Sequence, residues 1–169
     1  AETVPLRAGW LLHRFRQVGF RALSERVKRD DGLAVRAGTR LRTALRGPGA
    51  WRGLDPVLLD VELGFGSFLD ELAPDLLHAN DFRMLGVGAR AKARAANQGR
   101  TIKLVWDAHE FLPGIKPWDP HPRWLPAQIA YEREFAQYAD AVVTVSQELA
   151  ELLQEAHHLP ELPTVVLNC

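Results

Sequence analysis

The spacing of apolar residues changes along the chain and divides it into two parts. In residues 6–28, apolar side chains recur at intervals of three and four, which is the spacing of one face of a helix. A second helix is predicted for residues 33–45, and the glycines and proline of residues 47–49 predict its end. The first 50 residues contain no pattern typical of a strand.

The rest of the chain alternates short apolar runs with helical patterns. The runs predict strands at residues 75–79, 101–106, 141–145 and 164–167, with a further candidate strand at 57–61. Helices are predicted at residues 84–97, 127–138 and 147–157. This order is typical of an α/β, Rossmann-like parallel sheet with helices on both faces. We divide the chain into a basic helical segment, 1–53, packed on or inserted into an α/β domain, 54–169.

The net charge of zero conceals an uneven distribution along the chain. Residues 1–53 contain 12 Lys or Arg and 4 Asp or Glu, so the remainder carries the opposite excess. Four basic residues recur every seven positions beside the apolar face of the first helix: Arg7, Arg14, Arg21 and Lys28. Such a surface is compatible with an anionic membrane, with packing on the acidic remainder, or with solvated helix faces. Nucleic acid is not an expected partner, since no recognition motif is present.

Several classes of protein are disfavoured by composition. No apolar run approaches the roughly 18 residues that a spanning helix needs, and the N-terminus lacks the apolar stretch of a signal peptide. The single cysteine, Cys169, excludes an internal disulfide and fits a reducing compartment. We expect a cytoplasmic protein that is compatible with peripheral attachment to a membrane.

Polar side chains gather where the predicted strands end. Parallel α/β sheets bind ligands beyond the carboxyl ends of their strands. The residues at these ends, and therefore the candidate site, are His78, Asn80, Asp81, Asp107, His109, Glu110, Ser146 and Asn168. Ser146 also fits the N-cap of the helix that follows it.

Parts of the sequence also fit two other kinds of site, a dinucleotide-binding turn and a metal site. Residues 86–91 match the G-x-G-x-x-A fingerprint of dinucleotide-binding domains, and Asp107 lies 21 positions after Gly86. The glycines, however, do not follow the strand directly, and close packing of a helix on the sheet explains them as well. A metal site at Asp107, His109 and Glu110 lacks the helical zinc pattern, because Pro113 opposes a helix there. We expect no metal. His157, at a predicted helix end, is explained by the helix dipole.

Five phrases of the sequence occur together in a recognisable order. They are DLLHAND (75–81), DAHE (107–110), Glu132 in a helix, ADAVVTVS (139–146) and a last strand that ends at Asn168. In this order the chain resembles the N-terminal domain of family 4 glycosyltransferases, the large retaining group with the GT-B fold. The resemblance covers residues 72–169.

The resemblance implies sugar transfer from a nucleotide-sugar donor to a hydroxyl acceptor, either a sugar or a lipid-linked hydroxyl, with retention of configuration. It implies no required cofactor or metal. It places His109 near the transferred sugar as the candidate catalytic residue, in an orienting role as a neutral imidazole. Five further residues are implied to line the acceptor cleft: Asn80, Asp81, Asp107, Glu110 and Ser146.

The chain departs from the family pattern at both ends. It begins with basic helices where family members begin with a strand and a glycine-rich loop, and it stops where the family chain crosses into a second Rossmann domain. That domain carries two glutamates eight positions apart, and no two glutamates here have this spacing. We therefore expect a fragment that is inactive alone. A non-catalytic α/β binding module, and with less support a dinucleotide-binding domain, are the alternatives.

Overall fold

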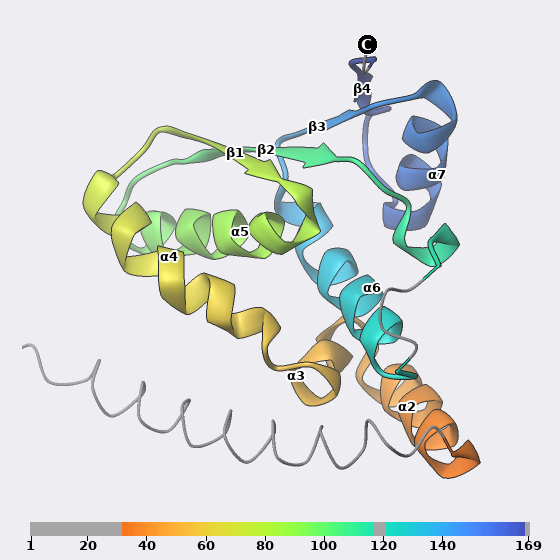
Figure 1. The fold of residues 1–169 in the computed structure, drawn as a ribbon. Coiled ribbons are helices and arrows are strands. Elements are labelled where there is room, and N and C mark those ends of the chain that lie inside the picture. Colours follow the sequence, from red (N-terminus) through yellow and green to blue (C-terminus); the bar gives the residue numbers. More distant parts are fainter. Residues whose placement is uncertain (1–31, 117–120, 168–169) are drawn as a thin grey trace, which may run out of the picture.

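The computed structural model describes residues 32–116 and 121–167 and is built on a four-stranded parallel sheet. The strands lie side by side in chain order (Figure 1): β1 (Leu76–Asn80), β2 (Lys103–Ala108), β3 (Ala141–Thr144) and β4 (Thr164–Val165). All three neighbouring pairs are parallel. The Rossmann-like α/β fold predicted from the sequence is confirmed. The predicted basic strip of Arg7, Arg14, Arg21 and Lys28 lies outside the described residues.

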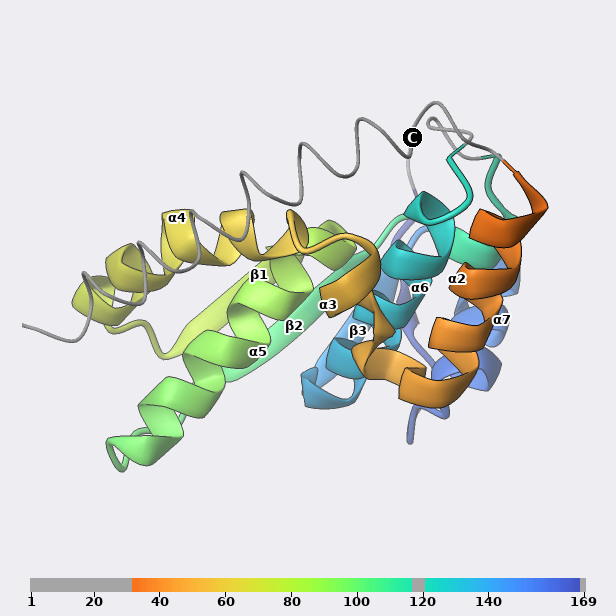
Figure 2. The ribbon, with the colours of Figure 1, turned by 90° about the horizontal axis from the view of Figure 1, so that it is seen from below.

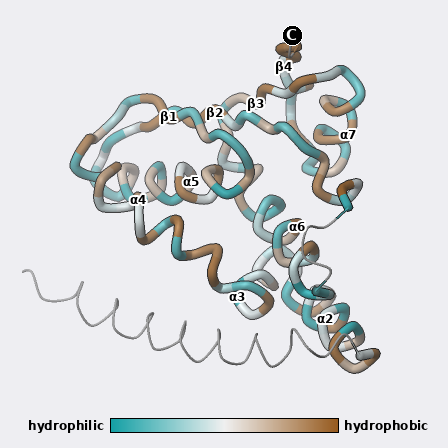
Figure 3. The backbone as a smooth tube through the Cα atoms, viewed as in Figure 1, coloured by the Kyte–Doolittle hydropathy of each residue, from teal (hydrophilic) through white to brown (hydrophobic). Residues whose placement is uncertain are grey.

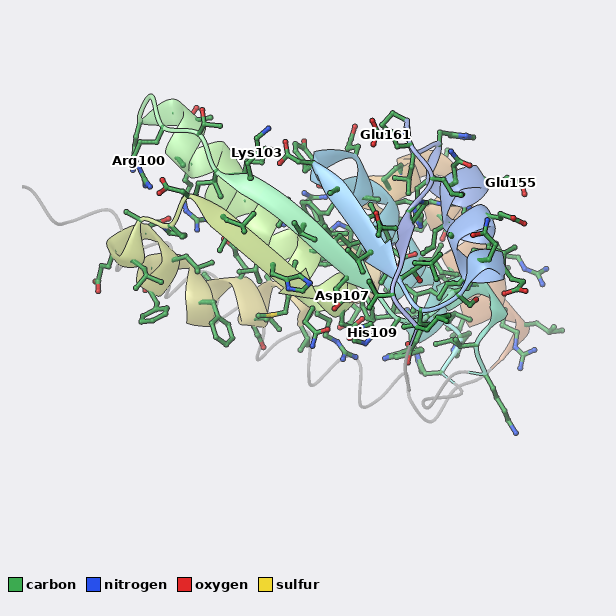
Figure 4. The ribbon with its side chains drawn as sticks, turned by 90° about the horizontal axis from the view of Figure 1, so that it is seen from above. Arg100, Lys103, Asp107, His109, Glu155 and Glu161 are labelled. Carbon is green, nitrogen blue, oxygen red and sulfur yellow. The ribbon has the colours of Figure 1, made fainter. Side chains whose placement is uncertain are left out.

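The three helices that connect the strands lie against one face of the sheet. They are α5 (Asp81–Asn97), α6 (Trp124–Phe135) and α7 (Gln147–His157). Figure 2 shows α5 and α6 in front of the strands from below, and Figure 4 shows the strands in front from above. Right-handed crossovers between strands in sequential order place every connecting helix on the same side. Among the described residues, the sheet is therefore covered on one face, where the sequence predicts both.

Burial alternates along β2 and shows the same difference between the two faces of the sheet. Leu104, Trp106 and Ala108 are buried on the helix side, whereas Lys103 is exposed and Asp107 is partly exposed on the opposite face. Successive strand residues point to opposite faces. One strand therefore supplies both the core and the uncovered face, which we call the open face.

The helices before β1 are α2 (Leu33–Arg46), α3 (Trp51–Leu54) and α4 (Leu58–Leu72), with a 3-10 turn at Gly47–Ala50. The strand considered at 57–61 is wrong, because these residues lie at the start of α4. The buried residues of α4, Leu58, Glu62 and Gly66, are spaced by four, which is the period of a helix. A short apolar run of this kind does not by itself distinguish a strand from a buried helical turn.

Trp51 anchors the N-terminal helices to the core. Its side chain is fully buried, and its ring meets Tyr131 of α6 edge-on at 4.9 Å between centroids. The indole Nε1 donates a hydrogen bond of 2.7 Å to Glu134 Oε2, and Arg52 also binds Glu134. The buried indole thus keeps a polar partner, as buried tryptophans usually do. The predicted domain boundary after residue 53 stays a prediction, although Trp51 shares its core with residues beyond it.

Two glycines let α5 approach its neighbours closely. A Cβ on Gly86 would overlap the hydroxyl of Tyr131, and a Cβ on Gly88 would lie 2.5 Å from Leu104 Cδ1. Both glycines lie inside α5, away from its N-terminus. The interpretation that they serve helix packing is confirmed, and they form no phosphate-binding turn after β1.

Asp140 ties β3 to β2. Its Oδ2 accepts hydrogen bonds from the Leu104 backbone N–H at 2.8 Å and from Lys92 Nζ at 2.6 Å, and Lys103 lies 3.3 Å from Oδ1. Slight burial alone would raise the pKa of Asp140, but the hydrogen bonds from Lys92, Leu104 and Lys103 outweigh it and lower the pKa to about 2. The Asp of the ADAVVTVS phrase is therefore a structural residue.

Replacing Gly86 with Ala should destabilise the fold by about 1–3 kcal/mol or more, because the added methyl group overpacks the contact with Tyr131. The matched control is Gly64→Ala in α4, where a Cβ would meet nothing within 4 Å. That variant should gain about 0.5–1 kcal/mol, since alanine is the better helix former. Urea unfolding measures both. Equal effects of the two substitutions would contradict the packing role of Gly86.

Replacing Asp140 with Asn should lower the free energy of unfolding by about 1 kcal/mol at pH 7, a value discounted for the solvent exposure of the lysine pairs. Because the folded pKa of about 2 lies below the 3.8 of an unperturbed aspartate, the carboxylate stabilises the fold above the unfolded pKa, and this stabilisation is lost as the pH falls toward 2. The difference between Asp140→Asn and the parent, followed by urea unfolding from pH 7 to pH 2, should therefore shrink below pH 4. A difference that is constant over this range would exclude the carboxylate charge as its source.

Candidate functional site

Asp107 lies between two histidines where β1 and β2 end. Its Oδ1 is 3.0 Å from His109 Nε2, and its Oδ2 is 3.4 Å from His78 Nε2. The side chain of Asp107 is 22% exposed, against 46% for His109 and 59% for His78, so the imidazoles are open to solvent and the carboxylate lies behind them. Figure 4 shows Asp107 and His109 next to each other at the carboxyl end of β2. We call these three residues the His-Asp-His cluster.

Strand register explains why these side chains meet. His78 pairs with Val105, and Asn80 pairs with Asp107. Alternate residues share a face, so His78 and Asp107 both lie on the open face, and His109 continues two residues beyond Asp107. The sequence predicts that His78, Asp107 and His109 belong to one edge of the sheet. The contact between His78 and Asp107 depends on the strand register, which the sequence does not give.

The cluster places a hydrogen-bond acceptor beside one nitrogen of His109. The 3.0 Å between Asp107 Oδ1 and His109 Nε2 is an ion-pair distance, and a carboxylate only accepts hydrogen bonds. In the neutral tautomer with its proton on Nε2, the Nδ1 atom has a lone pair that can accept a hydrogen bond from a hydroxyl. In residues 32–116 and 121–167, no group of three or more His, Cys, Asp or Glu side chains is arranged to hold a metal ion.

Asn80 and Asp81 lie at the same edge, between β1 and α5. Asn80 is exposed and makes no side-chain capping bond to the helix. Asp81 has a φ of 71°, in the left-handed region, and its Oδ1 accepts a hydrogen bond of 2.6 Å from the Phe82 N–H. A carboxylate is favoured at the start of a helix, where it interacts with the helix dipole. Asp81 therefore has a local structural role at the turn into α5.

Glu110 and Ser146 are not drawn into the cluster. Glu110 is exposed and forms no hydrogen bond or ion pair with the described part of the chain. Ser146 is the N-cap of α7, and its Oγ accepts a hydrogen bond of 3.2 Å from the Leu149 N–H. The N-cap interpretation of Ser146 is confirmed, and its contact with an acceptor stays a prediction. Asn168 lies outside the described residues.

A buried polar pair lies on the helix side of the sheet, opposite the cluster. Glu132 Oε1 of α6 is 3.0 Å from His157 Nε2 of α7, and the two side chains are 2% and 3% exposed. The His157 ring meets Trp106 of β2 edge-on, with centroids 5.5 Å apart. Burial raises the pKa of Glu132, and the hydrogen bond from His157 opposes this shift in part.

The helix-dipole explanation of His157 is therefore insufficient. His157 continues the stripe formed by Ala150 and Leu153, which are buried, at spacings of three and four. A histidine on such a stripe must either be neutral or find a buried partner, and Glu132 is that partner. The stripe was visible in the sequence, but the partner on α6 was not.

Comparison with known proteins gives one match. The family model described as Glycosyltransferase Family 4 matches residues 20–169, which include all four strands and α2 to α7. Searches of curated proteins and of solved structures gave no match.

Proposed function

Because the chain belongs to Glycosyltransferase Family 4 and forms an N-terminal domain of the GT-B type, we propose that it binds the acceptor in a retaining sugar transfer. The donor is a nucleotide sugar, and the acceptor offers a hydroxyl on a sugar or on a lipid-linked group. A second domain provides most contacts to the donor, so this domain alone does not catalyse the transfer. The resemblance to retaining GT-B enzymes supports these finer assignments.

The observation that carries the proposal is the contact between His109 and Asp107 at the carboxyl end of β2. The Asp107 carboxylate beside Nε2 favours the tautomer with its proton on that nitrogen, which leaves Nδ1 as an acceptor for a substrate hydroxyl. A group held in one orientation before the substrate binds lowers the entropic cost of reaching the reactive geometry. His109 acts in this way as an orienting residue.

The neighbouring side chains extend the proposed acceptor surface. Asn80 and Glu110 are exposed beside the cluster and have free hydrogen-bonding groups for hydroxyls, and His78 Nε2 lies 3.4 Å from the second oxygen of Asp107. Asp81 and Ser146 line the same edge while serving the turns that start α5 and α7. We further propose that transfer needs no metal ion or additional cofactor. The hydrogen-bonding character of these groups suits the hydroxyls of a sugar.

In the enzyme that carries this domain, His109→Ala should lower kcat by at least tenfold, and by about a hundredfold if the lost hydrogen bond is aimed at developing charge, a loss of about 3 kcal/mol. Asp107→Asn should reproduce part of this loss, since the amide retains the volume but not the carboxylate. Release of the nucleotide from the donor, at saturating acceptor, measures kcat.

The matched control is His158→Ala, because His158 is exposed at the end of α7 and outside the cluster. It should leave kcat unchanged, and circular dichroism should show the same fold for all variants. Unchanged turnover in a folded His109→Ala enzyme would assign His109 to the loop structure and remove the site from this edge of the sheet.

A further inference from the structure

The helix α2 turns an apolar face away from the rest of the described chain. Six residues share this face by helical periodicity, and all are exposed: Leu33, Ala34, Ala37, Leu41, Ala44 and Leu45. The three leucines are 87%, 61% and 76% exposed, whereas Thr39 on the opposite side is buried. Hydrophobic and hydrophilic stretches alternate along α2 in Figure 3. This arrangement reverses the usual one, in which the leucines of a surface helix face the core.

The charges of α2 select among the possible occupants of this face. The helix contains four arginines and no acidic residue: Arg36, Arg40, Arg42 and Arg46. Arg36 and Arg40 flank the leucines on one side of the helix, and Arg42 lies toward the other. Helices that lie in the interface of an anionic membrane combine an apolar face with flanking Lys or Arg. Arginine side chains can also extend along apolar surface while their charged ends reach the headgroups.

A second feature lies beside the leucine face. A cavity of about 230 Å³ opens between α2, Leu54 of α3 and the start of α6, and Arg42 and Arg123 line it together with Gly38 and Thr39. Arg42 Nη1 donates a hydrogen bond of 2.6 Å to the Gly53 carbonyl, which orients the side chain. Neither arginine pairs with a carboxylate in the described ranges. Partial burial and the nearby charge of Arg42 lower the pKa of Arg123, so the pair favours an anion.

We propose that α2 docks on an anionic phospholipid surface, with its leucines at the boundary of headgroups and acyl chains and one lipid phosphate between Arg42 and Arg123. Lipid supplies both parts of the match, an apolar layer and a plane of phosphates. Within the described ranges, no helix is long and apolar enough to cross a bilayer. The proposal is independent of the role of His109.

Sedimentation with lipid vesicles tests this surface in the full 169-residue chain. The chain should bind vesicles of phosphatidylcholine mixed with phosphatidylglycerol, bind phosphatidylcholine alone only weakly, and be released by salt. Leu41→Glu should weaken partitioning by at least about tenfold, because it places an acid at the apolar face. Arg123→Gln should weaken it by about fivefold, the effect of one basic residue near the surface.

Two matched controls separate α2 from the general charge of the chain. Leu72→Glu on α4 changes a leucine that is 61% exposed, the same fraction as Leu41. Arg133→Gln removes an exposed arginine at the other end of α6. Both controls should retain nearly the parent affinity for anionic vesicles. Leu41→Glu and Arg123→Gln should keep the circular dichroism spectrum of the parent.

Three results would overturn the proposal. The first is equal binding to neutral and anionic vesicles, and the second is an equal loss of binding for Leu41→Glu and Leu72→Glu. The third is a dimer in light scattering that Leu41→Glu dissociates, since this would assign the leucine face to a second copy of the chain. None of these results bears on the turnover of His109→Ala.

Discussion

The close packing of α5 against α6 and β2 is the constraint on which the rest of the domain depends. It requires that positions 86 and 88 carry no side chain, because Tyr131 and Leu104 occupy the space. Tyr131 then fits between α5 and Trp51, and its hydroxyl donates a hydrogen bond of 3.2 Å to the Arg83 carbonyl. Burial of the ring raises the pKa of Tyr131 to about 12. A larger residue at Gly86 would displace α6 and with it the contact to α3.

The position of α6 in turn determines what lies behind the candidate site. Glu132 of α6 reaches His157 of α7, whose ring packs on Trp106 of β2. The next residue of that strand is Asp107, on the opposite face, where its Oδ1 lies 3.0 Å from His109 Nε2. A buried side chain and an exposed cluster are thus attached to adjacent residues of one strand. The packed core on one face fixes the backbone of β2, and with it the position from which Asp107 projects onto the open face.

Much of this arrangement could be predicted from the sequence because it depends on local patterns. The helix predicted at 147–157 has the observed bounds, since Ser146 caps it and the apolar spacing is regular. The strands are displaced by only a residue or two. The helix at 58–72 is missing from the sequence prediction, which has a candidate strand at 57–61 instead, because a run of five residues fits both periods. Local patterns carry information over about one element and no further.

The contacts that could not be predicted all join residues far apart in the chain. His78 meets Asp107 through strand register, His157 meets Glu132 between two helices, and Asp140 binds Leu104 across two strands. The same holds for the cavity between Arg42 and Arg123, which needs α2 and α6 together. The sequence indicates the type of each residue and the side of its helix or strand, as for a histidine on an apolar stripe, but it does not indicate the residue's partner. Tertiary packing supplies those.

The two proposed surfaces are connected through α6. The helix begins beside Arg123, which lines the cavity at α2, and carries Glu132 nine positions later, roughly 14 Å along its axis at 1.5 Å per residue. Glu132 belongs to the buried pair behind β2, so a straight helix of known length separates the proposed lipid contact from the strand that carries Asp107. The cluster, however, lies on the open face of the sheet, opposite the layer of helices to which α6 belongs. The two proposed surfaces therefore face different sides of the domain, and the sheet between them separates binding at α2 from chemistry at His109.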